Sequence, residues 1–259
     1  MPAVTDAVVS EYVDAGFVRA IPVLTPAEVR YYRAAVEKTC AAIGGRVTRI
    51  DGVHYFFQWA WDLATHARLL DAMETLLGPN ILLKATRIFY KHARSTSFVG
   101  WHQDGITERV EDAQVPAVWL GLTDATAENG CLRVVPRSHR LGLVPHANVP
   151  DPDNLTSYGT TAQVEIEAPC DIVMKAGEMS LHHPLLLHAS NANRTGEPRI
   201  GFSATYSATP LPASLTAVAW VRGNGPAHPN EAQPPRYRSL DDAVAAHRAA
   251  GHQILRGPT

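Results

Sequence analysis

The chain of 259 residues has no long apolar run, few cysteines and little excess charge. No stretch reaches the roughly 18–20 apolar residues that a membrane-spanning helix requires, so no membrane segment is expected. Residues 1–6 carry no basic segment ahead of an apolar stretch, and a signal peptide is therefore not expected. The formal net charge of −2 lacks the positive surplus with which general nucleic-acid binders meet phosphates, so no nucleic-acid partner is expected.

Only three cysteines are present, Cys40, Cys131 and Cys170, and they lie far apart. The absence of a Cys-x-x-Cys pair removes the sequence signature of a zinc knuckle or a redox pair. Reduced, mostly buried thiols are typical of proteins in a reducing compartment, so a cytoplasmic location is expected. The hydrophobic share of 46% is ordinary for a globular protein with a full core.

Helix signals are concentrated in the first third of the chain. Thr5 can cap a helix that Gly16 ends, and the segment Thr25–Glu28 is a capping box with proline at the first helical position. The second helix is expected to run towards Gly44. A third is expected from about residue 65 to residue 77.

From Asn80 onward, short strand-like runs alternate with clusters of Gly, Pro, Asn and Asp. We expect strands at 81–83, 88–90, 118–120, 132–135, 164–166, 199–208 and 217–221, and a final helix at 240–250. Strands at this spacing without intervening helices favour an antiparallel sandwich or barrel. The expected organisation is one mainly β domain, with a mostly helical layer at 1–79, a β-core at 80–222 and a C-terminal tail and helix at 223–259.

His102, Asp104 and His188 are the strongest candidates for metal ligands. Side chains two apart on a strand share a face, so His102 and Asp104 are expected to point together while Gln103 turns away. His188 follows the apolar run 185–187 and is expected at the end of a buried strand. Two imidazoles and one carboxylate on one face of a metal leave coordination positions open, which suits non-haem Fe(II) and oxygen chemistry.

A carboxylate-binding corner is expected beside His188. Ser190 shares the face of His188, and the turn-forming residues 191–196 predict a hairpin that returns Arg199 to both. A guanidinium binds a carboxylate through two parallel hydrogen bonds. The pattern therefore indicates a co-substrate that carries a carboxylate.

Three motifs together resemble the phytanoyl-CoA dioxygenase family. They are His102-x-Asp104, the segment from Glu128 to His139 (Glu-Asn-Gly-Cys-Leu-x-Val-Val-Pro-x-Ser-His), and His183-Pro-Leu-Leu-Leu-His188-x-Ser190. The resemblance covers roughly residues 84–205. It implies a double-stranded β-helix, a cupin-like jelly-roll variant, that uses Fe(II), 2-oxoglutarate and O₂.

The same resemblance implies roles for individual residues. The three candidate ligands hold the iron, and Arg199 and Ser190 hold the distal carboxylate of 2-oxoglutarate. Trp119 is similar to the aromatic residue that packs beside this carboxylate. Phe89 and Lys91 stand where relatives often line the co-substrate pocket. No side chain beyond the metal ligands is given a catalytic role.

Departures from the family pattern spare the candidate ligands. Arg137 stands where relatives commonly have glycine, and Glu178 where they often have aspartate. Asp104 is present, whereas related halogenases lack this carboxylate and place chloride in its position. The resemblance therefore implies hydroxylation or another oxidation and not halogenation.

Other residues have competing interpretations. Trp59, in the aromatic stretch 54–61, is the best candidate for a wall of the substrate pocket, with core packing as the alternative. His182 and His183 are expected to have structural or supporting roles near the metal. Arg87 is able to meet an anionic substrate or to pair with an acidic neighbour.

The leading functional hypothesis is a 2-oxoglutarate-dependent oxygenase that oxidises an unactivated C–H bond of a small molecule, plausibly in bacterial secondary metabolism such as antibiotic biosynthesis. A carrier-protein or CoA conjugate remains open as the form of the substrate. One alternative is a cupin-like metalloenzyme without 2-oxoglutarate, which would have no need for Arg199 and Ser190. The other is a non-catalytic binding protein, in which loss of a metal ligand would be expected.

Overall fold

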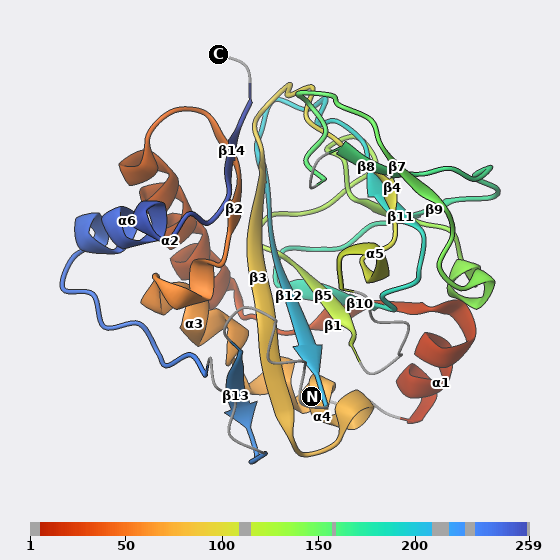
Figure 1. The fold of residues 1–259 in the computed structure, drawn as a ribbon, viewed down its shortest axis with the longest axis horizontal. Coiled ribbons are helices and arrows are strands. Elements are labelled where there is room, and N and C mark those ends of the chain that lie inside the picture. The colour runs from red at the N-terminus through yellow and green to blue at the C-terminus, as the bar shows by residue number, and fades with distance from the viewer. Residues whose placement is uncertain (1–5, 109–114, 157–158, 209–217, 226–230, 258–259) are drawn as a thin grey trace.

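The computed structural model describes residues 6–108, 115–156, 159–208, 218–225 and 231–257. The molecule is mainly β, with antiparallel sheets of eight and four strands at its centre (Figure 1). A separate pair joins β7 (His146–Asn148) to β8 (Thr160–Ala162). Among the described residues, no helix has both the length and the apolar character needed to cross a membrane.

The large sheet forms the central layer. Its strand order is β1 (Phe17–Pro22), β10 (Glu178–His182), β5 (Ala117–Gly121), β12 (Arg199–Ser207), β3 (Ile81–Lys91), β2 (Val47–Asp51) and β14 (Ile254–Arg256), with β13 (Ala219–Arg222) also paired to β3. Leu120, Ile88 and Phe202 point into the main hydrophobic core. The residues adjacent to these in the chain, such as Trp119 and Ser203, face the opposite side of the sheet, because strand side chains alternate.

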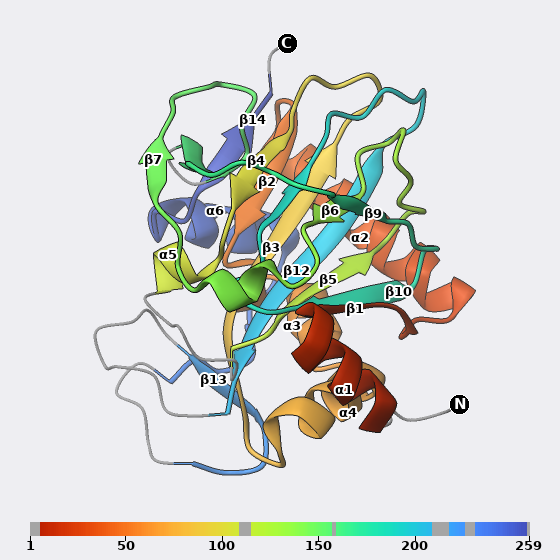
Figure 2. The ribbon, with the colours of Figure 1, turned by 90° about the vertical axis from the view of Figure 1, so that its right-hand side faces the viewer.

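The small sheet lies against that opposite side, as the two views together show (Figures 1 and 2). Its order is β4 (Val99–His102), β11 (His188–Ser190), β6 (Leu132–Val134) and β9 (Cys170–Ile172). The two sheets thus enclose a space between them that side chains of both line.

The described helices are α1 (Asp6–Ala15), α2 (Pro26–Ile43), α3 (Gln58–Ala64), α4 (Ala67–Leu77), α5 (Gly105–Glu108) and α6 (Leu240–Ala249), with short 3₁₀ turns at Val53–Tyr55 and Ser138–Leu141. The capping box of α2 is present: Thr25 Oγ1 accepts from the Glu28 amide at 3.3 Å, and Glu28 Oε2 accepts from the Thr25 amide at 2.7 Å. Helices α2, α3 and α6 cover the face of the large sheet away from the small one (Figure 1).

Several sequence-based boundaries were wrong. The region 1–79 is mostly helical, but it also contains β1 and β2, which were not expected and which extend the large sheet. The expected strands at 81–83 and 88–90 are one strand, β3, and the helix expected from residue 65 begins at Ala67. Residues 164–166 form no strand, since Val164 and Ile166 pack against a small apolar cluster without pairing. Thr5 and residue 217 lie outside the described residues.

Candidate functional site

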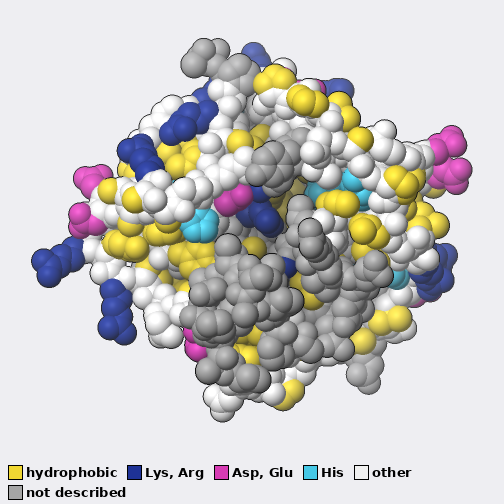
Figure 3. Space-filling view, viewed as in Figure 1, with side chains coloured by type: hydrophobic (Ala, Val, Ile, Leu, Met, Phe, Trp, Pro, Cys, Tyr) yellow, Lys and Arg dark blue, Asp and Glu magenta, His cyan; other side chains and the backbone are white. Residues whose placement is uncertain are grey.

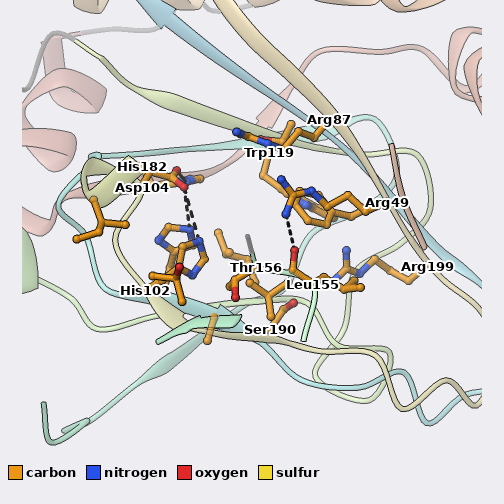
Figure 4. Close-up of a pocket in the computed structure, with 18 residues that line it drawn as sticks. Arg49, Arg87, His102, Asp104, Trp119, Leu155, Thr156, His182, Ser190 and Arg199 are labelled. Atoms are coloured by element: carbon orange, nitrogen blue, oxygen red, sulfur yellow. Dashed lines mark hydrogen bonds and ion pairs between the residues drawn. The ribbon is translucent and has the colours of Figure 1, made fainter. Parts of the chain in front are cut away.

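His102, Asp104 and His188 converge in space, and Figure 4 shows two of them, His102 and Asp104, close together. His102 ends β4, His188 begins β11, and the two are register partners across the small sheet. Asp104 Oδ1 lies 3.6 Å from His102 Nε2 and 3.9 Å from His188 Nε2. One nitrogen or oxygen of each residue lies within 4.8 Å of the others, which is compact enough for a single metal ion.

Both histidines present the same nitrogen to this point. His102 Nδ1 donates to Gly100 O at 2.8 Å and His188 Nδ1 donates to Leu186 O at 2.9 Å. A carbonyl only accepts, so each Nδ1 carries the proton and each Nε2 keeps its lone pair for a metal. Burial lowers the pKa of His188 well below its usual value, which favours the neutral imidazole that metals bind.

Asp104 is oriented by a third histidine. His182 Nε2, on β10 of the large sheet, donates to Asp104 Oδ2 at 3.3 Å, and Oδ1 is left facing His102 and His188. His183 points elsewhere, with its ring near Tyr12. The two adjacent histidines therefore differ in kind: one contacts the metal-site carboxylate and the other does not.

Strand alternation was the wrong reason for the His102–Asp104 pairing. Strand β4 ends at His102, and Asp104 lies in the turn that leads to α5. Gln103 does turn away, because its buried amide donates to Leu185 O at 2.6 Å and accepts from the Val144 amide at 2.9 Å. This anchor fixes the turn that carries Asp104.

Arg199 approaches the site by a route other than the expected hairpin. Strands β11 and β12 belong to different sheets, and Arg199 pairs in register with Lys91 of β3. Lys91 Nζ reaches back to the small sheet, where it donates to Ser190 Oγ at 2.7 Å and to Asn191 O. Arg199 and Ser190 both line the cavity, so the expected corner exists although its connection was misjudged.

The Arg199 guanidinium is buried and only partly satisfied. Its Nη2 donates to Gly130 O, whereas its Nε has no hydrogen-bond partner among the described residues. Burial lowers the pKa of Arg199 to about 10, so the group is charged at neutral pH. Burial and the charge of Arg199 lower the pKa of Lys91 well below its usual value. An incoming carboxylate would satisfy the unpaired donor and offset this positive charge.

Trp119 forms one wall of this corner. The Arg199 Cζ lies 5.1 Å from the centre of its ring. A Cβ on Gly201 would lie 2.2 Å from Trp119 Cζ2, so the indole rests directly on the backbone of β12. Glycine at residue 201 is therefore part of the site, which the sequence reading did not single out.

The cavity lies between the sheets and opens to solvent, and the space in it and at its mouth totals about 810 Å³. It appears as a hollow with Lys or Arg side chains on one side and His side chains on the other (Figure 3). Phe89 of β3 lines it. Trp59 does not: it is buried in the helical core, where its Nε1 donates to Thr39 Oγ1 at 3.1 Å. Core packing, the alternative for Trp59, is what the structure has.

Further cavity residues come from segments that the sequence reading placed elsewhere or passed over. They are Arg49, Val99, Ile106, Leu132, Leu155, Thr156, Thr160, Ala189 and Ser203. Arg49 was missed because β2 was assigned to the helical layer. The spacing of Arg49 and Asp51 was the available signal for this strand, since residues two apart on a strand lie on the same face.

Comparisons with known proteins identify the family. The family described as phytanoyl-CoA dioxygenase matches residues 12–201. Ectoine dioxygenase of Sphingopyxis alaskensis is 32% identical over 161 residues, which cover 56% of this chain and 53% of that protein. The human peroxisomal phytanoyl-CoA dioxygenase is 31% identical over 55% of this chain and 44% of its own length. The chain thus spans about half the length of these curated relatives.

Solved structures resemble almost the whole chain. The non-haem monooxygenase ThoJ in its apo form has a TM-score of 0.77 and 27% identity, with 94% of each chain covered. The epimerase SnoN, solved with Fe³⁺, α-ketoglutarate and nogalamycin RO, has a TM-score of 0.66 at 21% identity, covering 99% of this chain and all of that one. At 21% identity, the likeness to SnoN shows a shared fold alone.

Proposed function

This chain belongs to the phytanoyl-CoA dioxygenase family, and from that premise we propose that it is an Fe(II)- and 2-oxoglutarate-dependent oxygenase acting on a small organic molecule. The observation that carries the proposal is the pairing of two sites in one cavity. A two-histidine, one-carboxylate cluster lies on one wall, and a buried arginine with an unsatisfied donor lies on another.

The donor sets fit the two groups that the proposal requires. Two neutral imidazole nitrogens and one carboxylate oxygen suit Fe(II) and leave coordination positions for other ligands. The buried Arg199 suits a dicarboxylate, because its charge and its free Nε have no acidic partner among the described residues. His102, Asp104 and His188 would hold the iron, and Arg199 with Ser190 would hold the far carboxylate of 2-oxoglutarate.

When bound, the iron supplies the activation of O₂, with one oxygen atom going to succinate and the other to the substrate. The chain's own contribution is binding and positioning. Ser190 accepts a hydrogen bond from Lys91, so its hydroxyl proton is available for a carboxylate. Trp119 and Phe89 wall the corner and exclude water, which strengthens the electrostatic contacts inside it. No side chain is required as a general acid or base.

The fold and setting complete the proposal. We assign the two sheets to a double-stranded β-helix, forming one domain with its helices, in a cytoplasmic protein without a nucleic-acid or membrane partner. Ectoine and proline, named for two relatives, support a small organic substrate, and phytanoyl-CoA, named for a third, supports one that is conjugated to a carrier. Hydroxylation or another oxidation, and not halogenation, is the expected outcome because Asp104 is present.

An anaerobic titration tests the proposal. Metal-free protein is titrated with Fe(II) and then with 2-oxoglutarate, while the visible absorption is followed. A weak charge-transfer band that requires both additions is expected, together with its loss in Arg199→Ala at the same 2-oxoglutarate concentration. Loss of the charged contact should weaken co-substrate binding by about 1.5–3 kcal/mol, roughly 10- to 150-fold. Iron binding without any band would instead favour a metalloenzyme that does not use 2-oxoglutarate.

A further inference from the structure

The wall of the cavity formed by the large sheet carries a second pair of arginines, separate from Arg199. Arg49 of β2 and Arg87 of β3 both line the cavity, and the carboxylate of Asp51 lies between them. Asp51 and Arg87 are register partners across β2 and β3, and Arg87 is in turn opposite Ser203 of β12. Two positive charges therefore share one negative charge on this wall.

Each nitrogen of the Arg49 guanidinium already donates to a protein oxygen. Its Nε and Nη2 each donate to one oxygen of Asp51 at 2.7 Å, and its Nη1 donates to Leu155 O at 2.6 Å. Its side chain is only 4% exposed. These contacts make Arg49 a structural link between β2 and the loop that contains Leu155.

Arg87 is in the opposite situation. Its Nε lies 3.6 Å from Asp51 Oδ1, beyond hydrogen-bonding distance, and Asp51 is already engaged by Arg49. The Arg87 side chain is 24% exposed, and it borders the cavity together with Ser203. Ser203 of β12 is the register partner of both Arg87 and Trp119, and Figure 4 shows the Arg87 and Arg199 side chains at different places along the cavity. Among the described residues, none accepts a hydrogen bond from the Arg87 guanidinium, so its N–H groups can bind a ligand.

The surrounding charges make this part of the cavity attractive to an anion. Burial and the charge of Arg49 both lower the pKa of Arg87. Burial and the charge of Arg87 lower the pKa of the neighbouring Lys84 to about 8. The positive groups therefore repel one another, and a bound anion would relieve that repulsion.

We propose that Arg87, with Ser203 beside it, binds a carboxylate of the organic substrate and so holds that substrate across the cavity from the metal ligands. This inference rests on the proposed oxygenase function, in which Arg199 is occupied by 2-oxoglutarate. A carboxylate matches this wall, because Arg49 and Arg87 share the single carboxylate of Asp51 and Arg49 makes the shorter contacts with it. The substrate class is a small carboxylic acid, including amino acids, and not a neutral molecule.

The test uses the protein loaded with Mn(II) and saturating 2-oxoglutarate, with acetate as the probe. Paramagnetic Mn(II) speeds the relaxation of nearby protons, so the acetate methyl signal reports binding close to the metal. Acetamide has nearly the same shape without the charge and serves as the matched probe. We expect saturable relaxation of acetate and none of acetamide. In Arg87→Gln the apparent dissociation constant for acetate should rise about tenfold or more, because a charge-assisted hydrogen bond is lost.

Arg33→Gln is the matched protein control. Arg33 forms a partly exposed ion pair with Glu37 on helix α2 and does not line the cavity. It should leave acetate binding unchanged. Absence of saturable acetate binding in the native protein, or equal binding in Arg87→Gln, would overturn the inference. The methylene protons of 2-oxoglutarate in the same samples report the proposed function separately. If they are not relaxed while acetate binding still depends on Arg87, the oxygenase proposal fails and the anion site stands.

Discussion

Replacing His182 with leucine should weaken metal binding without touching a metal ligand. His182 Nε2 donates to Asp104 Oδ2 at 3.3 Å from a position that is nearly fully buried. A hydrogen bond to a charged group contributes about 1.5–3 kcal/mol, which corresponds to roughly 10- to 150-fold in affinity. Loss of such outer contacts to metal ligands commonly costs about 10–100-fold in metal affinity. We therefore expect a 10–100-fold rise in the apparent dissociation constant for Fe(II) in His182→Leu.

The measurement is an anaerobic Fe(II) titration of native and variant proteins, with circular dichroism to establish that both are folded. His182→Gln keeps a donor and should recover part of the affinity. His66→Leu is the control, because His66 contacts Glu28 and not the metal site. If His182→Leu binds Fe(II) as tightly as the native protein, then Asp104 is held by its turn alone, and the orienting role given to His182 is refuted.

Two further predictions concern packing and capping. Gly201→Ala should destabilise the fold by about 1–3 kcal/mol through overpacking, because its Cβ would lie 2.2 Å from Trp119 Cζ2; unchanged urea unfolding and unchanged tryptophan fluorescence would contradict the contact. Thr25→Ala should cost about 0.5–2 kcal/mol at neutral pH through loss of the helix cap. The backbone and hydroxyl of Thr25 lower the pKa of Glu28 to about 2. Since this value lies below the unfolded value of about 4.3, the contact between Thr25 and the ionised Glu28 carboxylate stabilises the fold above pH 4.3. This stabilisation is lost as the pH falls towards 2. The difference between Thr25→Ala and the native protein in urea unfolding should therefore shrink over that window, and a constant difference would argue against the capping box.

Local signals in the sequence were sufficient for the helices with strong caps. Thr25, Glu28 and Gly44 bound α2 closely, because capping is a contact between residues three or four apart. The strands of the large sheet were harder. Strands β1 and β2 are short, and only their pairing with β10 and β3, distant in sequence, makes them strands. Propensity alone therefore left them inside an apparently helical region.

The candidate metal ligands were identifiable because their residue types and spacing form a motif. For His182 and Arg87 the sequence predicted a supporting role and a possible anion contact, but not the residues that they contact. His182 reaches Asp104 from β10 of the large sheet, and Arg87 lies opposite Asp51 because β2 pairs with β3. Pairing of this kind is a property of the folded chain and has no short-range signature.

The metal candidates and the co-substrate anchor stand on different sheets: His102 and His188 on the small sheet, Arg199 on the large one. In the proposed reaction, 2-oxoglutarate is the one molecule that must touch both. The distance between the two sheets then determines which length of 2-oxo diacid can contact both groups. Oxaloacetate, one methylene shorter, and 2-oxoadipate, one methylene longer, are therefore expected to bind less tightly than 2-oxoglutarate. Selectivity for the co-substrate is thus a property of how far apart the two sheets are held, and residues that set this spacing contribute to it without touching any ligand.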